Sequence, residues 1–522
     1  MKSFRLILVL LSVVCLIASS CQKDNPENGG DEPITPITQD TTEIVNPIST
    51  SEVQYHGQIF IEARYEDETK LYFQITSPDE VALVSGLYYY QDNPSLAYIY
   101  RGEVVIPSAI THLGTTYSVT AIGGKAFAGS LVTSVVMPNS ITSILSVNAG
   151  YMQYDGAFAN CSSLESIRMS ENIEYIGPWA FNGCLCYEES VTIPNSVKRI
   201  GMGAFLSKIV YFNAENCTVA GERYDVGGSG VYQYYSAFPF ATTIVFGDNV
   251  KTLPGFIFAR QNLTVFDVPS SITTVSSYAF SGCNYLERIN SFENIQHIEP
   301  NAFFGCESHI TISLNSSLTK IDDGAFNYFA GLETIDIPNS VITIGDNAFS
   351  SSGLHIINWG NSVDTIGSSA FASCQNLNEV EIPNTVSYVG QGAFEYCEEL
   401  VSLTIGNKVN TIGSKACHYC FQLESVDFGN AVERIGEEAF KDCQFLYDIN
   451  LPGSVKFIDN NAFDGCHTTA TEITCLAVEP PVLGENVFDN RIIAYIHVPA
   501  SSVEAYKNAP GWSMYADKIV GI

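Results

Sequence analysis

The stretch that decides the fold reads LETIDIPNSVITIGDNAF and occupies residues 332–349. Ile335 and Ile337 are two positions apart, so in an extended strand both side chains point to one face and Asp336 points to the other. The Pro-Asn-Ser that begins at Pro338 ends such a strand in a turn, because proline fixes φ and the two polar side chains hydrogen-bond locally. The first half of the stretch therefore predicts a short strand followed by a turn.

The second half of the stretch brings the chain back toward the core. Val341 and Ile344 are apolar again, and Gly345 permits a tight corner. Ala348 and Phe349 are expected to begin a short helical or 3-10 turn that closes one coil. Such a coil has nothing to bury its apolar side against unless it stacks on a copy of itself.

The stretch is one unit of a long repeat. A phenylalanine, mostly preceded by alanine, recurs as an anchor, and twelve of the fifteen intervals between the sixteen anchors lie between 22 and 25 residues. The anchors are Phe127, Phe158, Phe181, Phe205, Phe238, Phe258, Phe280, Phe303, Phe326, Phe349, Phe371, Phe394, Phe440, Phe463 and Phe488, with Cys417 in one position. Neighbouring strands in such a stack lie ~4.8 Å apart. We therefore predict a solenoid of roughly sixteen coils over residues 118–490.

The repeat resembles a known family. The pattern Leu-x-x-Ile-x-Ile-Pro-x-Ser-Val-x-x-Ile-Gly-x-x-Ala-Phe-x-x-Cys is similar to the BspA-like (Treponema pallidum type) leucine-rich repeat of bacterial surface proteins, and it recurs at 332–349, 377–397 and 423–443. The resemblance implies a leucine-rich-repeat solenoid, mainly β with short helical or 3-10 turns. It also implies a surface protein, since members are described mainly as adhesins or as binders of host or microbial partners.

The N-terminus carries a targeting signal. Lys2 and Arg5 precede an apolar run that is too short to cross a bilayer as a helix but suits a signal peptide, here residues 1–20. Small residues lead into Cys21, and the segment resembles the signal of bacterial lipoproteins, which implies acylation of Cys21; ordinary signal cleavage is the alternative. Residues 21–50 are rich in Pro, Asn, Asp, Thr and Gly and predict a flexible tether.

Both ends of the repeat differ from its middle, as capping segments do. Residues 51–117 contain alternating apolar stretches at 59–65, 70–75 and 86–90, which predict strands of an N-terminal β cap. Residues 491–522 predict a C-terminal cap with a strand at 494–498 and a short helix at 503–508.

Charge and motifs narrow the function. The formal net charge of −32 disfavours nucleic acid as a partner. No metalloprotease, phosphate-loop or serine-nucleophile motif is present in the sequence, so we expect no cofactor and no metal. The pair Cys417 and Cys420 has redox spacing, but Cys420 lies three residues after the anchor position, as do eight other cysteines. We interpret these as a ladder of small buried thiols. The eight are Cys161, Cys184, Cys283, Cys306, Cys374, Cys397, Cys443 and Cys466.

Two surfaces are candidates for binding. The residue between the paired strand aliphatics forms an outward row, which could dock a partner or could be a plainly solvated face: Arg168, Thr192, Asp267, Asn290, Ser313, Asp336, Asn358, Glu381, Thr404, Asp427 and Asn450. The long intervals that end at Phe158 and Phe238 predict loops, which could form one recognition patch or could pack over a disrupted coil: Tyr151, Tyr154, Tyr224, Tyr232, Tyr234 and Tyr235.

These patterns predict a non-enzymatic adhesion or recognition protein, lipid-anchored at the outer membrane or cell surface, that binds protein or glycan partners. One alternative is a glycan-capture lipoprotein of a nutrient-uptake system. Another is a hydrolase in the N-terminal unit, because carboxylates are plentiful and a catalytic pair is not excluded by sequence.

Overall fold

A computed structural model describes residues 47–55, 58–66, 69–84, 100–147, 156–225, 232–466, 471–488 and 493–522. The predicted signal peptide, Cys21 and nearly all of the predicted tether lie outside these ranges, as does the strand expected at 86–90. Strand β1 begins at Ser49, so the last two residues of the segment predicted as a tether belong to a strand.

The N-terminal strands form an antiparallel unit that continues into the repeats. Strands β1 to β4 pair as successive antiparallel neighbours, and β4 then pairs in parallel with β7, which carries the ladder onward. The predicted strands at 59–65 and 70–75 are confirmed as β2 and β3. The bounds are β1 (Ser49–Tyr55), β2 (Gln58–Arg64), β3 (Lys70–Ser77), β4 (Glu80–Val84), β5 (Arg101–Val105), β6 (Ala109–His112) and β7 (Thr115–Ile122).

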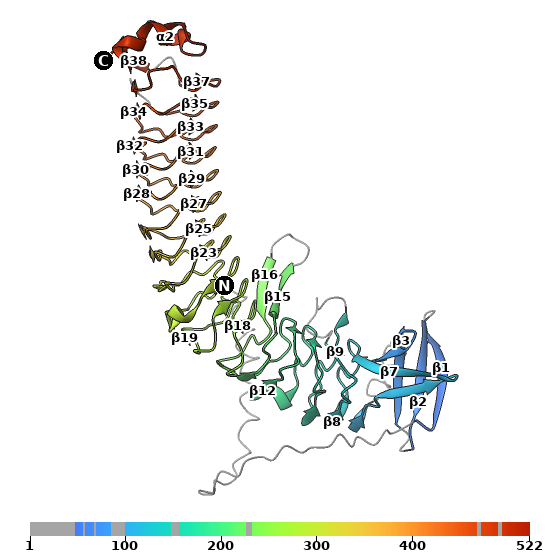
Figure 1. Cartoon of the computed structure of the whole chain (residues 1–522). Helices are drawn as coiled ribbons and strands as arrows, with labels where there is room; N and C mark the ends of the chain where they lie inside the picture. The colour runs from blue at the N-terminus through green and yellow to red at the C-terminus, as the bar shows by residue number, and fades with distance from the viewer. Residues whose placement is uncertain are drawn as a thin grey trace, which may run out of the picture. The chain divides into compact units, whose positions relative to one another are not determined.

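The repeats stack as parallel rungs, and Figure 1 shows them in succession from β23 to β37. On one side the rungs contribute short strands. In the unit at 332–349 this strand ends at Ile344, the aliphatic residue that precedes the corner glycine. Hairpin β15–β16 interrupts this side. The bounds are β9 (Ser143–Ile144), β11 (Tyr175–Ile176), β13 (Arg199–Ile200), β15 (Val219–Asp225), β16 (Tyr232–Ser236), β18 (Thr252–Leu253), β20 (Thr274–Val275), β22 (His297–Ile298), β23 (Lys320–Ile321), β25 (Thr343–Ile344), β27 (Thr365–Ile366), β29 (Tyr388–Val389), β31 (Thr411–Ile412), β33 (Arg434–Ile435), β35 (Phe457–Ile458) and β37 (Val482–Leu483).

A second set of strands holds the outward row predicted from the sequence, and we call the exposed side of these strands the strand face. In the repeats their neighbours pair in parallel. The bounds are β8 (Leu131–Val136), β10 (Ser166–Arg168), β12 (Ser190–Ile193), β14 (Ile209–Phe212), β17 (Thr243–Phe246), β19 (Val265–Asp267), β21 (Arg288–Asn290), β24 (Thr334–Asp336), β26 (Ile356–Asn358), β28 (Glu379–Glu381), β30 (Ser402–Thr404), β32 (Ser425–Asp427), β34 (Asp448–Leu451), β36 (Thr471–Cys475), β38 (Ile493–Val498) and β39 (Ile519–Gly521).

One coil shows how the unit is built. Ile335 and Ile337 are buried and Asp336 is exposed, as the alternation predicts. A Cβ atom on Gly345 would approach the backbone carbon of Asp322 and the backbone nitrogen of Asp323 to 2.8 Å, so close stacking of the coils requires glycine there. The corner at Phe349 is closed by successive hydrogen bonds between residues three apart, with Asn347 at φ 55°. It is a run of turns with 3-10-type bonds rather than a regular helix.

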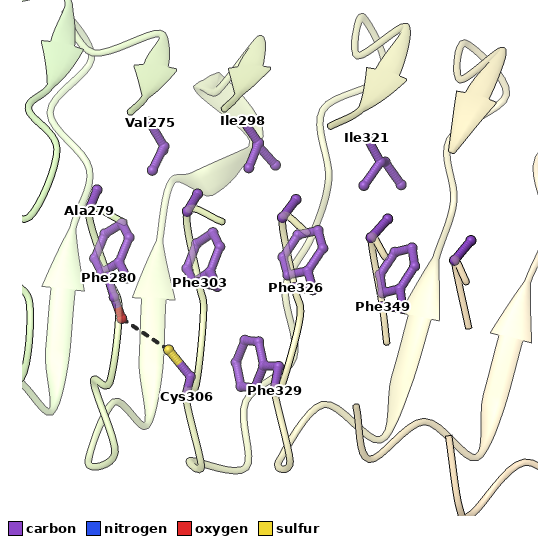
Figure 2. Close-up of a cluster of buried hydrophobic side chains, with 14 of the residues drawn as sticks. Val275, Ala279, Phe280, Ile298, Phe303, Cys306, Ile321, Phe326, Phe329 and Phe349 are labelled. Atoms are coloured by element: carbon purple, nitrogen blue, oxygen red, sulfur yellow. Dashed lines mark hydrogen bonds between the residues drawn. The ribbon is translucent and has the colours of Figure 1, made fainter. Parts of the chain in front are cut away.

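The anchor phenylalanines form a buried column, part of which is drawn in Figure 2. Successive rings lie 4.8 to 5.9 Å apart between centroids and are nearly parallel. Between Phe238 and Phe258 the contact passes through Phe212 and Phe246. The predicted stacking of anchor on anchor is confirmed, with Cys417 replacing one ring.

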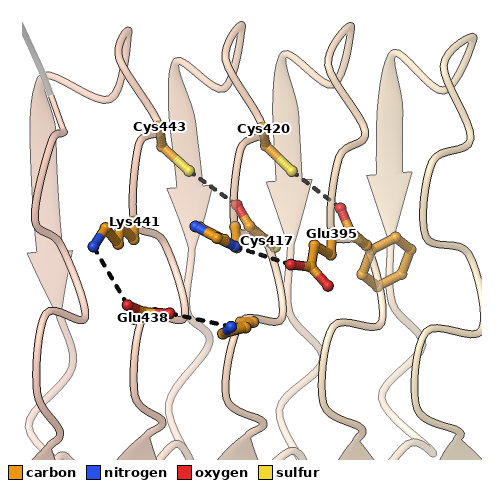
Figure 3. Close-up of polar contacts among 9 residues, drawn as sticks. Glu395, Cys417, Cys420, Glu438, Lys441 and Cys443 are labelled. Carbon is orange, nitrogen blue, oxygen red and sulfur yellow. Dashed lines mark hydrogen bonds and ion pairs between the residues drawn. The ribbon is translucent and has the colours of Figure 1, made fainter.

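The nine cysteines that follow the anchors form a second buried ladder. Each Sγ donates a hydrogen bond to the carbonyl oxygen of the anchor residue in the preceding coil, at 2.9 to 3.2 Å. Figure 2 shows this bond for Cys306, and Figure 3 shows it for Cys420 and Cys443. Burial raises the pKa of Cys306 to about 12, so the thiol is neutral and inert at physiological pH.

The C-terminal segment covers the last coil. Helix α2 (Val503–Asn508) confirms the helix predicted at 503–508. The Tyr506 hydroxyl donates to the Ala477 carbonyl oxygen at 2.7 Å, the Trp512 indole donates to that of Pro481 at 2.7 Å, and the Tyr515 hydroxyl donates to that of Phe488 at 2.9 Å. The three rings are buried and their polar atoms are satisfied. In the ranges that the structure describes, the other helical turns are 3-10: η4 (Leu185–Tyr187), η5 (Phe292–Asn294), η6 (Ala500–Ser502) and η7 (Ser513–Tyr515).

Candidate functional site

The residues of the predicted outward row lie on the strand face, except Ser313, which is exposed but belongs to no strand. Asn290 is half-buried, and the other members named as binding candidates are exposed: Arg168, Asp267, Asp336, Asn358, Glu381, Asp427 and Asn450. Neighbouring members are cross-strand partners, as Glu381 is with Thr404, and Thr404 is with Asp427. The row is therefore regular within each ladder of strands.

Part of the row is engaged in bonds between coils. The Asn290 amide donates to Asp267 Oδ1 at 2.5 Å, and the Asn358 amide donates to Asp336 Oδ1 at 2.7 Å. Asp427 Oδ1 accepts the backbone N–H of Gly429 at 2.9 Å. These contacts hold the side chains in place, so the row has a structural role beside any role in binding.

Sequence reasoning missed two apolar members of the strand face. Tyr211 on β14 is the cross-strand partner of both Thr192 on β12 and Val245 on β17, and the exposed fractions of Tyr211 and Val245 are 44% and 46%. The sequence did contain a signal for these two residues. In β14 and β17 exposed and buried positions alternate, and the residue that follows each of them, Phe212 or Phe246, is buried. The polar row is thus divided by an apolar segment before it resumes at Asp267.

A candidate site is a groove of about 1100 Å³ on the strand face across β26, β28, β30 and β32. Four members of the predicted row line it, namely Asn358, Glu381, Thr404 and Asp427. Three lining residues, Glu379, Glu381 and Asp427, carry carboxylates, and no lysine or arginine lines the groove. The structure therefore brings the middle of the predicted row together into one acidic concavity.

Trp359 shapes one end of this groove. It occupies the position of Ile337 in the repeat, and its ring is half-buried and contacts Phe371 edge-on at 5.6 Å between centroids. Its replacement of an aliphatic was visible in the sequence, but periodicity alone gives no reason to connect it with a site. Two turns that line the groove are bonded to each other, since Asn384 Oδ1 accepts the backbone N–H of Asn407 at 2.7 Å.

The tyrosine-rich interval before Phe238 forms the antiparallel hairpin β15–β16. Tyr234 is half-buried and stacks on Phe256 and Tyr278, at 5.9 and 4.8 Å between centroids. Tyr235 lies 5.8 Å from the guanidinium carbon of Arg260. Tyr224 and Tyr232 lie within the hairpin strands. Tyr234 thus packs over a coil, as the structural alternative for this loop predicted.

Two further candidate residues, Tyr151 and Tyr154, lie outside the described residues. The hypothesis that the two loops form one patch therefore stays a prediction. Within the described ranges, no cluster of three or more His, Cys, Asp or Glu side chains is placed to hold a metal ion. In the same part of the chain, no helix has the length and apolarity that a bilayer span requires.

Several solved structures are similar to the chain. A leucine-rich repeat protein from Bacteroides ovatus is 22% identical, with 92% of this chain and 99% of that chain covered and a TM-score of 0.42. A leucine rich cell surface protein from Faecalibacterium prausnitzii is 22% identical, with 70% and 94% covered and a TM-score of 0.36. A T. pallidum leucine rich repeat protein is 26% identical, with 35% and 78% covered and a TM-score of 0.27.

No curated protein matches the chain significantly. The sequence itself matches the family described as BspA type leucine rich repeat region, which is found in six copies over residues 120–222, 251–378 and 343–470. These ranges cover more than half of the chain and coincide with the stacked rungs. The chain therefore belongs to the BspA-type leucine-rich repeat family.

Proposed function

We propose that the protein is an exported binding scaffold of a bacterial surface or envelope, anchored through an acylated Cys21, that engages protein or glycan partners without catalysis. The observation that carries the proposal is the groove of about 1100 Å³ on the strand face. It spans four coils of a rigid ladder, and solenoids commonly use such surfaces for binding. Family membership and the surface location of the F. prausnitzii protein support it.

The groove's acidic lining sets the expected electrostatics of binding. Its three carboxylates have no lysine or arginine among the lining residues, where His355 is the one histidine, so they favour ligands with cationic or hydrogen-bond-donor groups. Such a contribution weakens as ionic strength rises, because exposed charges are screened beyond about 10 Å at 0.1 M salt.

Charge reversal in the groove tests this function. The purified chain is screened against a panel of matrix proteins and a glycan array, and the variant Glu381→Lys/Asp427→Lys is measured on each ligand found. We expect binding to fall at least tenfold. A matched control is Glu437→Lys/Glu485→Lys, which changes the net charge equally at two exposed glutamates away from the groove. Equal affinity of both double variants would exclude the groove.

The anchor has its own test. Metabolic labelling with an alkyne fatty acid should tag the wild-type chain and not Cys21→Ser, and protease treatment of intact cells should cleave the wild-type protein. An unlabelled wild-type chain would show that ordinary signal cleavage operates instead.

A further inference from the structure

The corners of the coils contain a second row of positions with an unusual backbone. The residue two after the anchor has a positive φ, between 57° and 73°, in thirteen coils. We call these positions the corner row: Gly129, Asn160, Gly183, Arg260, Gly282, Gly305, Tyr328, Ser351, Ser373, Tyr396, Tyr419, Asp442 and Gly465. Glycine suits this left-handed region and Asn or Asp tolerates it, whereas a bulky side chain is strained there.

Three tyrosines and Arg260 nevertheless occupy the corner row, and two of the tyrosines are exposed. Tyr328 is 54% exposed and Tyr396 is 40% exposed. Burial therefore offsets little of the strain at these residues. A positive φ recurs at this position in most coils, so what distinguishes Tyr328 and Tyr396 is that they place exposed aromatic rings there.

The tyrosine rings are supported from behind. Tyr396 stacks on Tyr419 at 5.0 Å between centroids and 16° between planes. This distance is about one coil spacing, so the two rings stack along the direction in which the coils succeed one another. At the other end Tyr328 rests edge-on against Phe304 at 5.5 Å.

Two serines separate the tyrosines along the row. Ser351 and Ser373 lie in the coils between Tyr328 and Tyr396, whose anchors follow one another at 5.3, 5.2 and 5.4 Å. The backbone N–H of each corner residue donates to a backbone carbonyl oxygen of the next coil at 2.7 to 2.8 Å. The pairs are Tyr328 with Ser350, Ser351 with Ala372, Ser373 with Glu395 and Tyr396 with His418. The Gln375 amide also donates to the Tyr396 carbonyl oxygen at 2.8 Å. The spacing of the two rings is therefore fixed by the backbone.

This segment of the corner row is uncharged, although the chain as a whole carries a formal charge of −32. Flat aromatic faces with hydroxyl and amide groups between them match a neutral ligand that has both apolar faces and many hydroxyls. We propose that Tyr328, Tyr396 and the serines between them form a subsite for a neutral glycan chain, separate from the acidic groove on the strand face.

The test replaces both tyrosines with glycine, which removes the aromatic rings and also the unfavourable positive φ of a bulky residue. The full chain is applied to an array of β-glucans, mannans and xylans, and the polysaccharide that binds best is titrated against wild type and Tyr328→Gly/Tyr396→Gly. We expect at least tenfold weaker binding by the variant, with an unchanged or higher Tm, because glycine is preferred at positive φ. The control Tyr388→Ser removes an equally exposed tyrosine of β29, off the corner row, and should change the affinity less than twofold.

Several results would overturn the subsite. They are a wild-type chain that binds none of these neutral glycans, a double variant that binds within twofold of wild type, or a loss of binding that occurs only toward proteins. A fall in Tm of more than about 3 °C would show that the tyrosines stabilise the fold and would remove the strain argument. The charge-reversed groove variant should still bind the glycan, so failure of the groove and failure of this subsite are distinguishable.

Discussion

Removing one ring from the middle of the phenylalanine column should cause a large loss of stability. Phe349 is fully buried, with neighbouring ring centroids at 5.3 Å (Phe326) and 5.2 Å (Phe371). Phe→Ala substitutions in cores cost about 3–5 kcal/mol. Both faces of this ring are stacked, and the ladders on either side keep the coils from collapsing into the void. We therefore expect Phe349→Ala to lose about 4–5 kcal/mol of unfolding free energy.

The loss should also be local. Each coil contacts only its neighbours, so the missing contacts belong to the rungs on either side of Phe349. Denaturant unfolding gives the free energy, and native-state hydrogen exchange shows where protection is lost. Cys417→Ala is the matched control, because that column position already holds a small side chain, and it should cost only about 1 kcal/mol.

Two results would refute this reasoning. A loss below about 2 kcal/mol for Phe349→Ala would mean that the coils relax into the cavity, contrary to a rigid ladder. Exchange that rises equally throughout the described coils would mean that stability is global, and the nearest-neighbour account of the column would fail.

Three further predictions follow from the core and the N-terminal sheet. Buried ladder thiols such as Cys374, whose pKa burial raises to about 12, should not react with a disulfide reagent at pH 8 until the chain is denatured, as mass-spectrometric mapping of the modified cysteines would show. Reaction of Cys374 in the folded state would contradict the ladder, whereas reaction of half-buried Cys186, which lies outside the ladder, would not. Tyr234→Ala should lower the Tm because it removes two stacked contacts, whereas an unchanged Tm would make the ring dispensable for packing. Burial alone would raise the pKa of Glu62, but bonds from Arg64, Tyr72 and Lys70 hold it below 4.5. The stability it contributes is complete above pH 4.5 and is lost as the pH falls through the lowered pKa, so the deficit of Glu62→Gln in urea unfolding should shrink from about pH 6 to about pH 3. A constant deficit would contradict this linkage.

The interior of the coils could be predicted from the sequence because it depends on local spacing. Ile335, Asp336 and Ile337 alternate as a strand must, and the recurrence of Phe and Cys at fixed offsets requires that like residues stack. The same spacing placed Glu381 and Asp427 on one exposed face. Apolar periodicity is therefore sufficient to predict whether a side chain of the repeat is buried or exposed.

The features of the sites could not be predicted because they depend on relations between coils. The groove exists because Trp359 and the turn residues of several rungs leave a concavity, and no single unit encodes it. The positive φ of Tyr328 and Tyr396 opposes their residue type, so local propensity points away from it. The length of the interval before Phe238 predicted an insertion, but not the antiparallel pairing of β15 with β16.

The corner row shows how a solenoid fixes distances between surface groups. The separation of Tyr328 from Tyr396 is set by the number of coils between them, because each corner amide bonds to the next rung. Deleting one such coil would shorten the separation by about 5 Å, the spacing of neighbouring strands, without altering either ring's surroundings in its own coil. Because the core of a coil is made by its inward residues, an outward residue can change at little cost in stability. Surface specificity in this protein can therefore vary in steps of whole rungs while the column of anchors keeps the register.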